Sequence, residues 1–289
     1  MKRRLLIVGC GDIARRTLPQ LARHWRIYVL MRERDPSLKG VTQVIGDLDH
    51  LKTLRRLTGL AHAVLYTAPP STATNDDDPR IRRFMAVLRR GRLPQSLVYI
   101  GTTGVYGDCG GQWVTETRPI APLTNRAQRR VAAEIALRHF GTTGCRVSLL
   151  RVPGIYAANR LPLERIRQGW PVVTEVFTNH IHADDLALAC AAALLRGRPN
   201  RIYNICDDSE WTVEEWFNRL AQTFHLPLPP SVSRREAQRI LSPMQFSFMN
   251  ESRRIDNRRM KKELGVKLNH PVINMETLTR MVTKPTPVT

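Results

Sequence analysis

The sequence is poor in the residues that build disulfide frameworks and zinc sites. An odd number of isolated cysteines is typical of buried thiols in a reducing compartment. No two of them form a Cys-x-x-Cys pair, and no group of His, Cys and Asp residues has metal-ligand spacing. We therefore expect neither disulfides nor a metal site. The five cysteines are Cys10, Cys109, Cys145, Cys190 and Cys206.

The sequence also lacks a long apolar run. No stretch reaches the roughly 18 apolar residues that a membrane-spanning helix needs. The apolar run near the N-terminus is cut by Gly9, Gly11 and Asp12, and no small-residue cleavage site follows it. This pattern does not fit a signal peptide. We expect a cytoplasmic protein that makes no membrane contact.

Acidic residues are scarce, with 25 Asp and Glu against 45 Lys and Arg, which gives a formal net charge of +20. Most of the basic residues are arginines, and they are spread along the whole chain. Such a charge can serve nucleic acid, a membrane surface or polyphosphate ligands, and it can also reflect a biased genome. Aromatic residues make up only 6%, and no zinc-finger or RNA-binding pattern accompanies the arginines. The sequence therefore argues against nucleic-acid binding as the main function.

Aliphatic runs alternate with amphipathic stretches in the first half of the chain. This alternation predicts βαβ units and an α/β fold, a Rossmann-type doubly wound parallel sheet with helices on both faces. The expected strands are 4–8, 26–31, 41–45, 63–66, 96–100 and 145–150. The expected helices are 13–24, 48–57, 81–90 and 122–140.

The alternation loosens after about residue 151, where prolines interrupt the pattern. We expect an NAD(P)-binding domain over 1–151, with return segments at about 172–206. A smaller, partly interleaved substrate lobe is expected over 152–289. A helix is predicted from Thr212, with Glu215 three residues later completing a capping box.

The turn Gly9-Cys10-Gly11-Asp12-Ile13-Ala14 sits between the first expected strand and the first expected helix. Gly9 permits a tight turn, Gly11 lets the backbone approach a pyrophosphate, and Ala14 allows close packing of helix and strand. The helix N-terminus, which includes Asp12 and Ile13, offers N–H groups to the phosphates. This context predicts a dinucleotide site.

The tip of the second strand bears on the choice of cofactor. An NAD site needs a carboxylate there for the ribose 2′-hydroxyl, whereas this chain has Met31 and Arg32. Arg32 and Arg34 suit a 2′-phosphate, which favours NADP. Glu33 is one residue away and keeps NAD as the alternative, and Arg34 fits a solvated surface charge equally well.

Other residues at strand ends are expected to contact the cofactor. Asp47 and Leu48 follow the third strand, where Asp47 fits either a helix cap or an adenine contact. Thr67 and Ala68 end the fourth strand, and their small side chains let a cofactor lie close to the sheet. The acidic run from Asp76 to Asp78 is expected to be a solvated loop and helix-start charge.

Several spaced segments resemble the extended and atypical short-chain dehydrogenase/reductases, in particular the NAD-dependent epimerase/dehydratase group. Beside the glycine turn and 46–48, these segments are 99–108, 150–156, 180–185 and 203–205. The resemblance implies that Thr102 bonds the substrate oxygen and that Pro153 contacts the cofactor. It also implies a homodimer or a monomer, and a small-molecule substrate that is phosphorylated or nucleotide-linked.

The sequence departs from this family at its acid/base. The family uses a Tyr and, four residues later, a Lys; these positions fall on Arg126 and Arg130 here. A guanidinium stays protonated, so Arg126 cannot shuttle a proton, although Arg130 can still bind the ribose or a phosphate. Tyr106 is the candidate replacement, with a packed aromatic as its alternative, and His182 is expected mainly to cap a helix and pack the substrate lobe.

Three functions remain open on the sequence. The first is an NADP-dependent oxidoreductase or epimerase with an atypical acid/base. The second is a non-catalytic NADP(H)-binding redox sensor or regulatory protein, favoured by the loss of both Tyr and Lys. The third is a nucleic-acid-associated protein, favoured only by the net charge.

Overall fold

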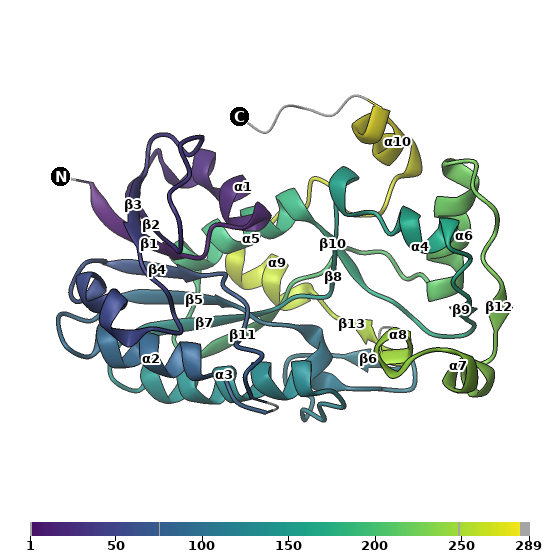
Figure 1. Ribbon diagram of the computed structural model, residues 1–289, viewed down its shortest axis with the longest axis horizontal. Helices are drawn as coiled ribbons and strands as arrows, with labels where there is room; N and C mark the ends of the chain where they lie inside the picture. The colour runs from purple at the N-terminus through teal and green to yellow at the C-terminus, as the bar shows by residue number, and fades with distance from the viewer. Residues whose placement is uncertain (1, 75, 248, 284–289) are drawn as a thin grey trace.

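A sheet of seven parallel strands forms the centre of the computed structural model, which describes residues 2–74, 76–247 and 249–283 (Figure 1). The strand order is β11-β7-β5-β4-β1-β2-β3, so the chain starts mid-sheet and winds outward in both directions. This confirms the predicted doubly wound α/β fold. The strands are β1 (Arg3–Val8), β2 (Trp25–Met31), β3 (Thr42–Ile45), β4 (Ala63–Tyr66), β5 (Ser96–Ile100), β7 (Arg146–Arg151) and β11 (Arg201–Asn204).

Helices cover both faces of this sheet, because successive side chains of a strand point to opposite faces. In β1, Leu5 and Ile7 join one apolar core, whereas Leu6 and Val8 join the other. All four are fully buried, which explains the continuous apolar run. Figure 1 shows helices on both sides of the sheet. They include α1 (Asp12–Leu21) and α5 (Ala183–Arg196) on the first face, and α2 (Pro79–Leu88) and α3 (Asn125–Gly141) on the second.

The C-terminal part of the chain builds a smaller lobe with an apolar core of its own. It lies beyond the carboxyl ends of the sheet strands, at the right of Figure 1. Its helices are α4 (Leu163–Arg167), α6 (Val213–Thr223), α7 (Arg234–Ile240), α8 (Pro243–Ser247) and α10 (Met275–Thr283), while α9 (Arg258–Leu264) packs against α5. Three short two-stranded parallel sheets lie outside the central sheet. They pair β8 (Gly154–Tyr156) with β10 (His180–His182), β9 (Val172–Val173) with β12 (Ser231–Val232), and β6 (Trp113–Val114) with β13 (Arg254–Ile255).

Two local predictions have different outcomes. The capping box is confirmed, since Thr212 and Glu215 each accept the other's backbone N–H at the start of α6. The helix expected over 48–57 is instead a 3-10 helix, η1 (Leu51–Leu57). The Thr53 hydroxyl bonds the carbonyls of Asp47 and His50, and so competes with regular helical hydrogen bonds.

Asp78 was expected in a solvated loop and is fully buried. Its carboxylate caps α2 by accepting the N–H of Arg80 at 3.1 Å. Burial raises the pKa of Asp78 above its ordinary value. The prediction that Asp78 lies at a helix start is therefore confirmed. The prediction that it is solvated is wrong, because the folded chain covers the N-terminus of α2.

In the described part of the chain, no helix is both long and apolar enough to cross a membrane.

Candidate cofactor and substrate site

The turn between β1 and α1 is packed tightly against the end of β4. Gly9 has a φ of +87°, and a Cβ there would lie 3.2 Å from the backbone of Ala68. Thr67 donates its hydroxyl hydrogen to the carbonyls of Val8 and Gly9. Gly11 is the N-cap of α1, and a Cβ on it would meet no atom within 4 Å. The turn is thus closed on one side and open at the helix N-terminus, where a pyrophosphate binds well.

A cavity of about 590 Å³ opens beside this turn, and we call it the nucleotide pocket. Its size lies in the range of small-molecule sites. Seven of the predicted cofactor-binding residues line it: Gly9, Gly11, Arg32, Asp47, Leu48, Thr67 and Ala68. The other lining residues are Cys10, Leu30, Met31, Glu33, Gly46, Pro69 and Arg80.

The remaining predicted cofactor residues lie outside this lining. Ile13 and Ala14 are buried beneath the turn, where they pack α1 against the sheet. Arg34 is exposed beyond the tip of β2. Asp12, Arg130 and Pro153 contact other parts of the molecule, described below. Their contact with a cofactor stays a prediction.

Charged side chains line the nucleotide pocket from two directions. Arg32 and Glu33 line it together from the tip of β2. Arg80 lines it from α2 and holds Asp49 with an Nη2–Oδ2 distance of 2.5 Å. This bond lowers the pKa of Asp49. No sequence motif identified Arg80, because only the fold brings α2 to the β2 tip.

Asp12 joins the nucleotide turn to the smaller lobe through ion pairs. Its carboxylate lies 2.9 Å from Nε of Arg16 and 2.8 Å from Nε of Arg160. Arg160 belongs to η3 (Ala158–Arg160) in the smaller lobe. Arg16 also reaches Asp184, at the start of α5, at 2.7 Å. These pairs position the helix N-terminus against the facing lobe.

A second cavity, of about 270 Å³, lies where β5 ends and α3 begins, and we call it the Thr102 pocket. Thr102 caps η2 (Thr103–Tyr106), with its Oγ1 accepting the N–H of Gly104 at 3.1 Å. Its hydroxyl hydrogen is then available to a ligand. Both lobes contribute to the lining, which also includes Thr103, Thr124, Arg126, Ala127, Pro153, Gly154, Phe177, Thr178, Asn179, Val213, Ser247, Glu251 and Arg253.

The two arginines at the family's Tyr and Lys positions occupy different surroundings. Arg126 lines the Thr102 pocket from the first turn of α3, and burial lowers its pKa. Arg130 donates from Nη1 to Tyr99 Oη at 3.0 Å and to the carbonyl of Ile100 at 2.8 Å. Arg130 is therefore bound to the end of β5, whereas Arg126 lines the Thr102 pocket.

Tyr106 lies in the interior, outside the residues that line the Thr102 pocket. Its hydroxyl donates to Asn204 Oδ1 at 2.7 Å, and the Arg151 guanidinium lies 4.7 Å from its ring centroid. Burial raises the pKa of Tyr106 to about 12. This environment corresponds to the packed-aromatic alternative of the sequence analysis.

His182 caps α5, accepting the N–H of Asp184, and packs edge-on against Tyr156. Burial, together with the neighbouring His270, lowers the pKa of His182 to about 4. The structural role expected for His182 is confirmed. Ligand atoms of His182, Asp184 and His270 lie within 4.8 Å of one another, a grouping with metal-binding side chains that the sequence did not reveal. One oxygen of Asp184 is already bound by Arg16.

The smaller lobe supplies polar residues that sequence reasoning missed. Arg253 donates to Glu251 at 2.6 Å and to the carbonyl of Gly107 at 2.8 Å. Asn179 donates to the Arg253 carbonyl and accepts from the N–H of Ile255. These residues carry no motif, and more than 70 residues separate Asn179 from its partners in the sequence.

A cavity of about 330 Å³ continues from the Thr102 pocket into the smaller lobe, and we call it the lobe cavity. The two cavities share Gly154, Thr178 and Val213 in their linings. The lobe cavity combines arginines with aromatic rings, a combination that suits phosphates and a stacked base. These side chains are Arg160, Arg165, Tyr156, Trp216 and Phe217.

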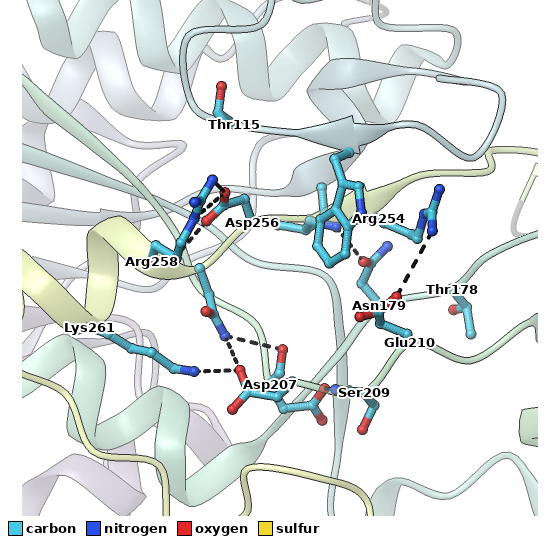
Figure 2. Close-up of a pocket in the computed structure, with 14 residues that line it drawn as sticks. Thr115, Thr178, Asn179, Asp207, Ser209, Glu210, Arg254, Asp256, Arg258 and Lys261 are labelled. Carbon is cyan, nitrogen blue, oxygen red and sulfur yellow. Dashed lines mark hydrogen bonds and ion pairs between the residues drawn. The ribbon is translucent and has the colours of Figure 1, made fainter.

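A further cavity, of about 600 Å³, adjoins the Thr102 pocket at Thr178 and Asn179. Figure 2 shows Asp207 on one side of it and Arg254 on the other. Burial raises the pKa of Asp207 to about 8, so its carboxyl holds a proton over much of the neutral range. None of the predicted site residues lines this cavity.

Comparison with known proteins connects this geometry to a family. Residues 80–206 match the model of the NAD dependent epimerase/dehydratase family. No curated protein matches the chain by sequence. Among solved structures, a functionally unknown conserved protein from Silicibacter pomeroyi DSS is 28% identical, with a TM-score of 0.76 over 98% of both chains.

Two structures of named enzymes share the fold. The dTDP-glucose 4,6-dehydratase from Streptomyces venezuelae, solved with NAD bound, is 20% identical, with a TM-score of 0.78 over 97% of this chain and 96% of that chain. The UDP-N-acetylglucosamine 4-epimerase from Methanobrevibacter ruminantium M1 is 13% identical, with a TM-score of 0.76 over 98% of each. Residues 80–206 are therefore similar to the NAD dependent epimerase/dehydratase family, and nearly the whole chain shares the fold of these solved structures.

Proposed function

We propose that the protein is an NAD(P)-dependent oxidoreductase or epimerase that acts on a hydroxyl or carbonyl carbon. One observation carries the proposal: the nucleotide pocket and the Thr102 pocket both lie at the carboxyl edge of one parallel sheet. Ligands of doubly wound folds bind at that edge. The lobe cavity, with its arginines and aromatic rings, supports a substrate that is nucleotide-linked or phosphorylated.

The chemistry follows from the side chains around Thr102. When bound, NAD(P)⁺ supplies a hydride acceptor. The Thr102 hydroxyl would hold the reacting oxygen of the substrate. Arg126 cannot take a proton, so it would instead stabilise the negative charge that develops on that oxygen. Loss of the hydride from the substrate carbon would leave a carbonyl, and the proton of the substrate hydroxyl would pass to water.

NADP is the proposed cofactor, with NAD as the alternative. Arg32 lines the nucleotide pocket at the tip of β2, and a guanidinium group binds a 2′-phosphate well. Glu33 lines the same pocket and favours a free 2′-hydroxyl. Arg80 also lines the pocket but is paired with Asp49, so Arg32 is the residue that supports the phosphate.

Calorimetric titration with NADPH and NADH tests the cofactor, using Arg32→Asp and the matched control Arg34→Asp. Arg34 is a neighbouring arginine outside the pocket lining, so its variant changes the net charge equally. We expect tighter binding of NADPH, reversal of the preference in Arg32→Asp, and little change in Arg34→Asp. If neither nucleotide binds to the unaltered protein, the proposed function is wrong.

The second candidate function is a redox sensor that binds NADP(H) without turnover. It is favoured by Arg126 and Arg130, which replace the family's Tyr and Lys. NADPH binding with no oxidation of NADPH across a panel of carbonyl substrates would favour the sensor. The cytoplasm remains the predicted location, and a monomer or homodimer the predicted assembly.

A further inference from the structure

The edge of the central sheet at which the strands begin, which we call the amino edge, collects most of the excess positive charge. Because the strands run parallel, they all begin on this side, and the helices that precede them end there. Six segments that meet at this edge contain fifteen Lys and Arg and no Asp or Glu. They are 2–4, 22–26, 55–62, 89–96, 138–146 and 195–201. These segments therefore carry +15 of the net charge of +20, although the arginines are spread along the whole sequence.

Backbone hydrogen bonds hold the starts of neighbouring strands side by side. The N–H of His62 donates to the carbonyl of Arg4 at 2.9 Å, and the carbonyl of His62 accepts the N–H of Gln95 at 2.8 Å. The carbonyl of Gln95 accepts the N–H of Arg146 at 3.0 Å. Arg4 is also the register partner of Arg26 in β1 and β2. The cations of separate segments thus follow one row across the sheet, in which neighbouring strands lie about 4.8 Å apart.

Helix ends widen this row on both faces of the sheet. Arg23 follows α1 and Arg196 ends α5 on one face, while Arg89 follows α2 and Arg138 lies in the last turn of α3 on the other. The negative end of a helix dipole favours such cations, which explains part of the enrichment. It does not explain the cations at the strand starts, such as those of segment 2–4.

Few of these charges are neutralised by the described part of the chain. Twelve of the fifteen cationic residues are exposed. Among the described residues, the ion pairs at this edge are those of Arg198 and Arg201 with Glu263. Other cations bind groups without a net charge, as Arg146 does with the carbonyl of Leu194. The amino edge is therefore a continuous positive surface.

We propose that the amino edge docks a nucleic-acid duplex through its phosphates, without reading its sequence. Seven strands span about 29 Å, which matches about eight base pairs of a duplex. A row of cations suits a linear chain of phosphates, and the helix ends beside it can reach the second chain of a duplex. The nucleotide pocket and the Thr102 pocket lie at the opposite, carboxyl edge, so this docking is a function beside the proposed one.

The side chains of the amino edge favour a duplex over a single strand or a lipid surface. Single-stranded bases stack on exposed aromatic rings. The aromatic residues of the six segments are Trp25 and Phe140, and both are buried. Leu195 is the one exposed large apolar residue of these segments, which leaves little to insert into a membrane.

Fluorescence anisotropy with a labelled DNA duplex of about 20 base pairs tests the docking. The edge variant is Arg90→Gln/Arg92→Gln, and the matched control is Arg235→Gln/Arg239→Gln, which removes two exposed arginines from α7. We expect the edge variant to bind roughly fivefold more weakly or worse, and the control to change little. The slope of log affinity against log salt should also become shallower by about two in the edge variant alone.

Any of four results would overturn the inference: no salt-dependent binding of the duplex at low salt, equal losses in the two variants, tighter binding of a single strand or of phosphatidylserine vesicles, or displacement of the duplex by NADPH. Displacement would place the phosphates in the nucleotide pocket instead of at the amino edge. NADPH affinity is measured in the same samples. NADPH binding without duplex binding contradicts only this inference, whereas duplex binding without NADPH binding contradicts only the proposed function.

Discussion

Arg151 and Glu134 form an ion pair in the interior, with 2.7 Å between Nη2 and Oε2 and side-chain exposures of 4% and 5%. Arg151 ends β7, and Glu134 lies in the middle of α3. The pair therefore ties α3, which carries Arg126, to the central sheet. Because buried charges are costly without a partner, removal of either residue should disturb the fold more than the site.

Glu134→Gln should lower the free energy of unfolding by about 3–5 kcal/mol, because it leaves the Arg151 guanidinium buried without a counter-charge. Urea denaturation measures this change. Glu164→Gln is the control, since Glu164 pairs with Arg167 at 3.4 Å on the surface, and exposed pairs contribute about 0–1 kcal/mol. Equal effects of the two substitutions would contradict the role given to burial.

Tyr106→Phe should cost stability and leave the chemistry intact. The substitution removes the donor to Asn204 Oδ1 in a buried site, which is expected to cost about 1–3 kcal/mol. NADPH affinity and the turnover of any substrate found should not change, because Tyr106 faces no ligand pocket described above. A large fall in turnover with normal stability would restore Tyr106 as the acid/base.

Asp207 should make stability fall as the pH rises. Its pKa is about 8 in the folded protein against an ordinary value of 3.8, so the folded state holds a proton that the unfolded state has lost. Between these two values the free energy of unfolding should fall by up to about 1.4 kcal/mol per pH unit from this group. Asp207→Asn removes the titration, so the difference between the two proteins isolates it. Parallel curves of unfolding free energy from pH 5 to about 8 would count against a raised pKa.

The two glycines of the nucleotide turn should respond differently to alanine. Gly9→Ala places a Cβ 3.2 Å from the Ala68 backbone at a φ of +87°, so both stability and NADPH affinity should fall. Gly11→Ala meets no protein atom within 4 Å, so the melting temperature should stay close to that of the unaltered protein while NADPH affinity falls. Unchanged affinity in Gly11→Ala would show that the pyrophosphate lies elsewhere.

The sequence predicted the central fold because local signals there agree with the tertiary structure. Both faces of the sheet are buried, so its strands appear as continuous apolar runs, and the helices between them have clear starts. The exception is the segment near Thr53, where a side-chain hydroxyl bonds backbone carbonyls and tightens the helix. This competition between a side-chain hydroxyl and the backbone N–H groups depends on local geometry, which helix propensity does not describe.

The sequence predicted the part of the candidate site that carries motifs and missed the part that does not. The glycine turn and the tip of β2 carry motifs, and seven of the predicted residues line the nucleotide pocket. Arg80, Glu251 and Arg253 have no motif and reach the two pockets only because distant segments fold against the sheet edge. The prediction that Asp78 is solvated was wrong because segments distant in the sequence fold over it and bury it.

The sequence by itself determined where the sheet strands and the glycine turn lie along the chain. It also determined that arginine occupies the family's Tyr and Lys positions. Periodicity and glycine spacing act over a few residues and can be seen without a fold. Only the tertiary structure decided that Arg126 faces a pocket while Arg130 binds Tyr99 and Ile100. The physical reason is that burial, ion pairing and cavity shape depend on contacts between residues far apart in the chain.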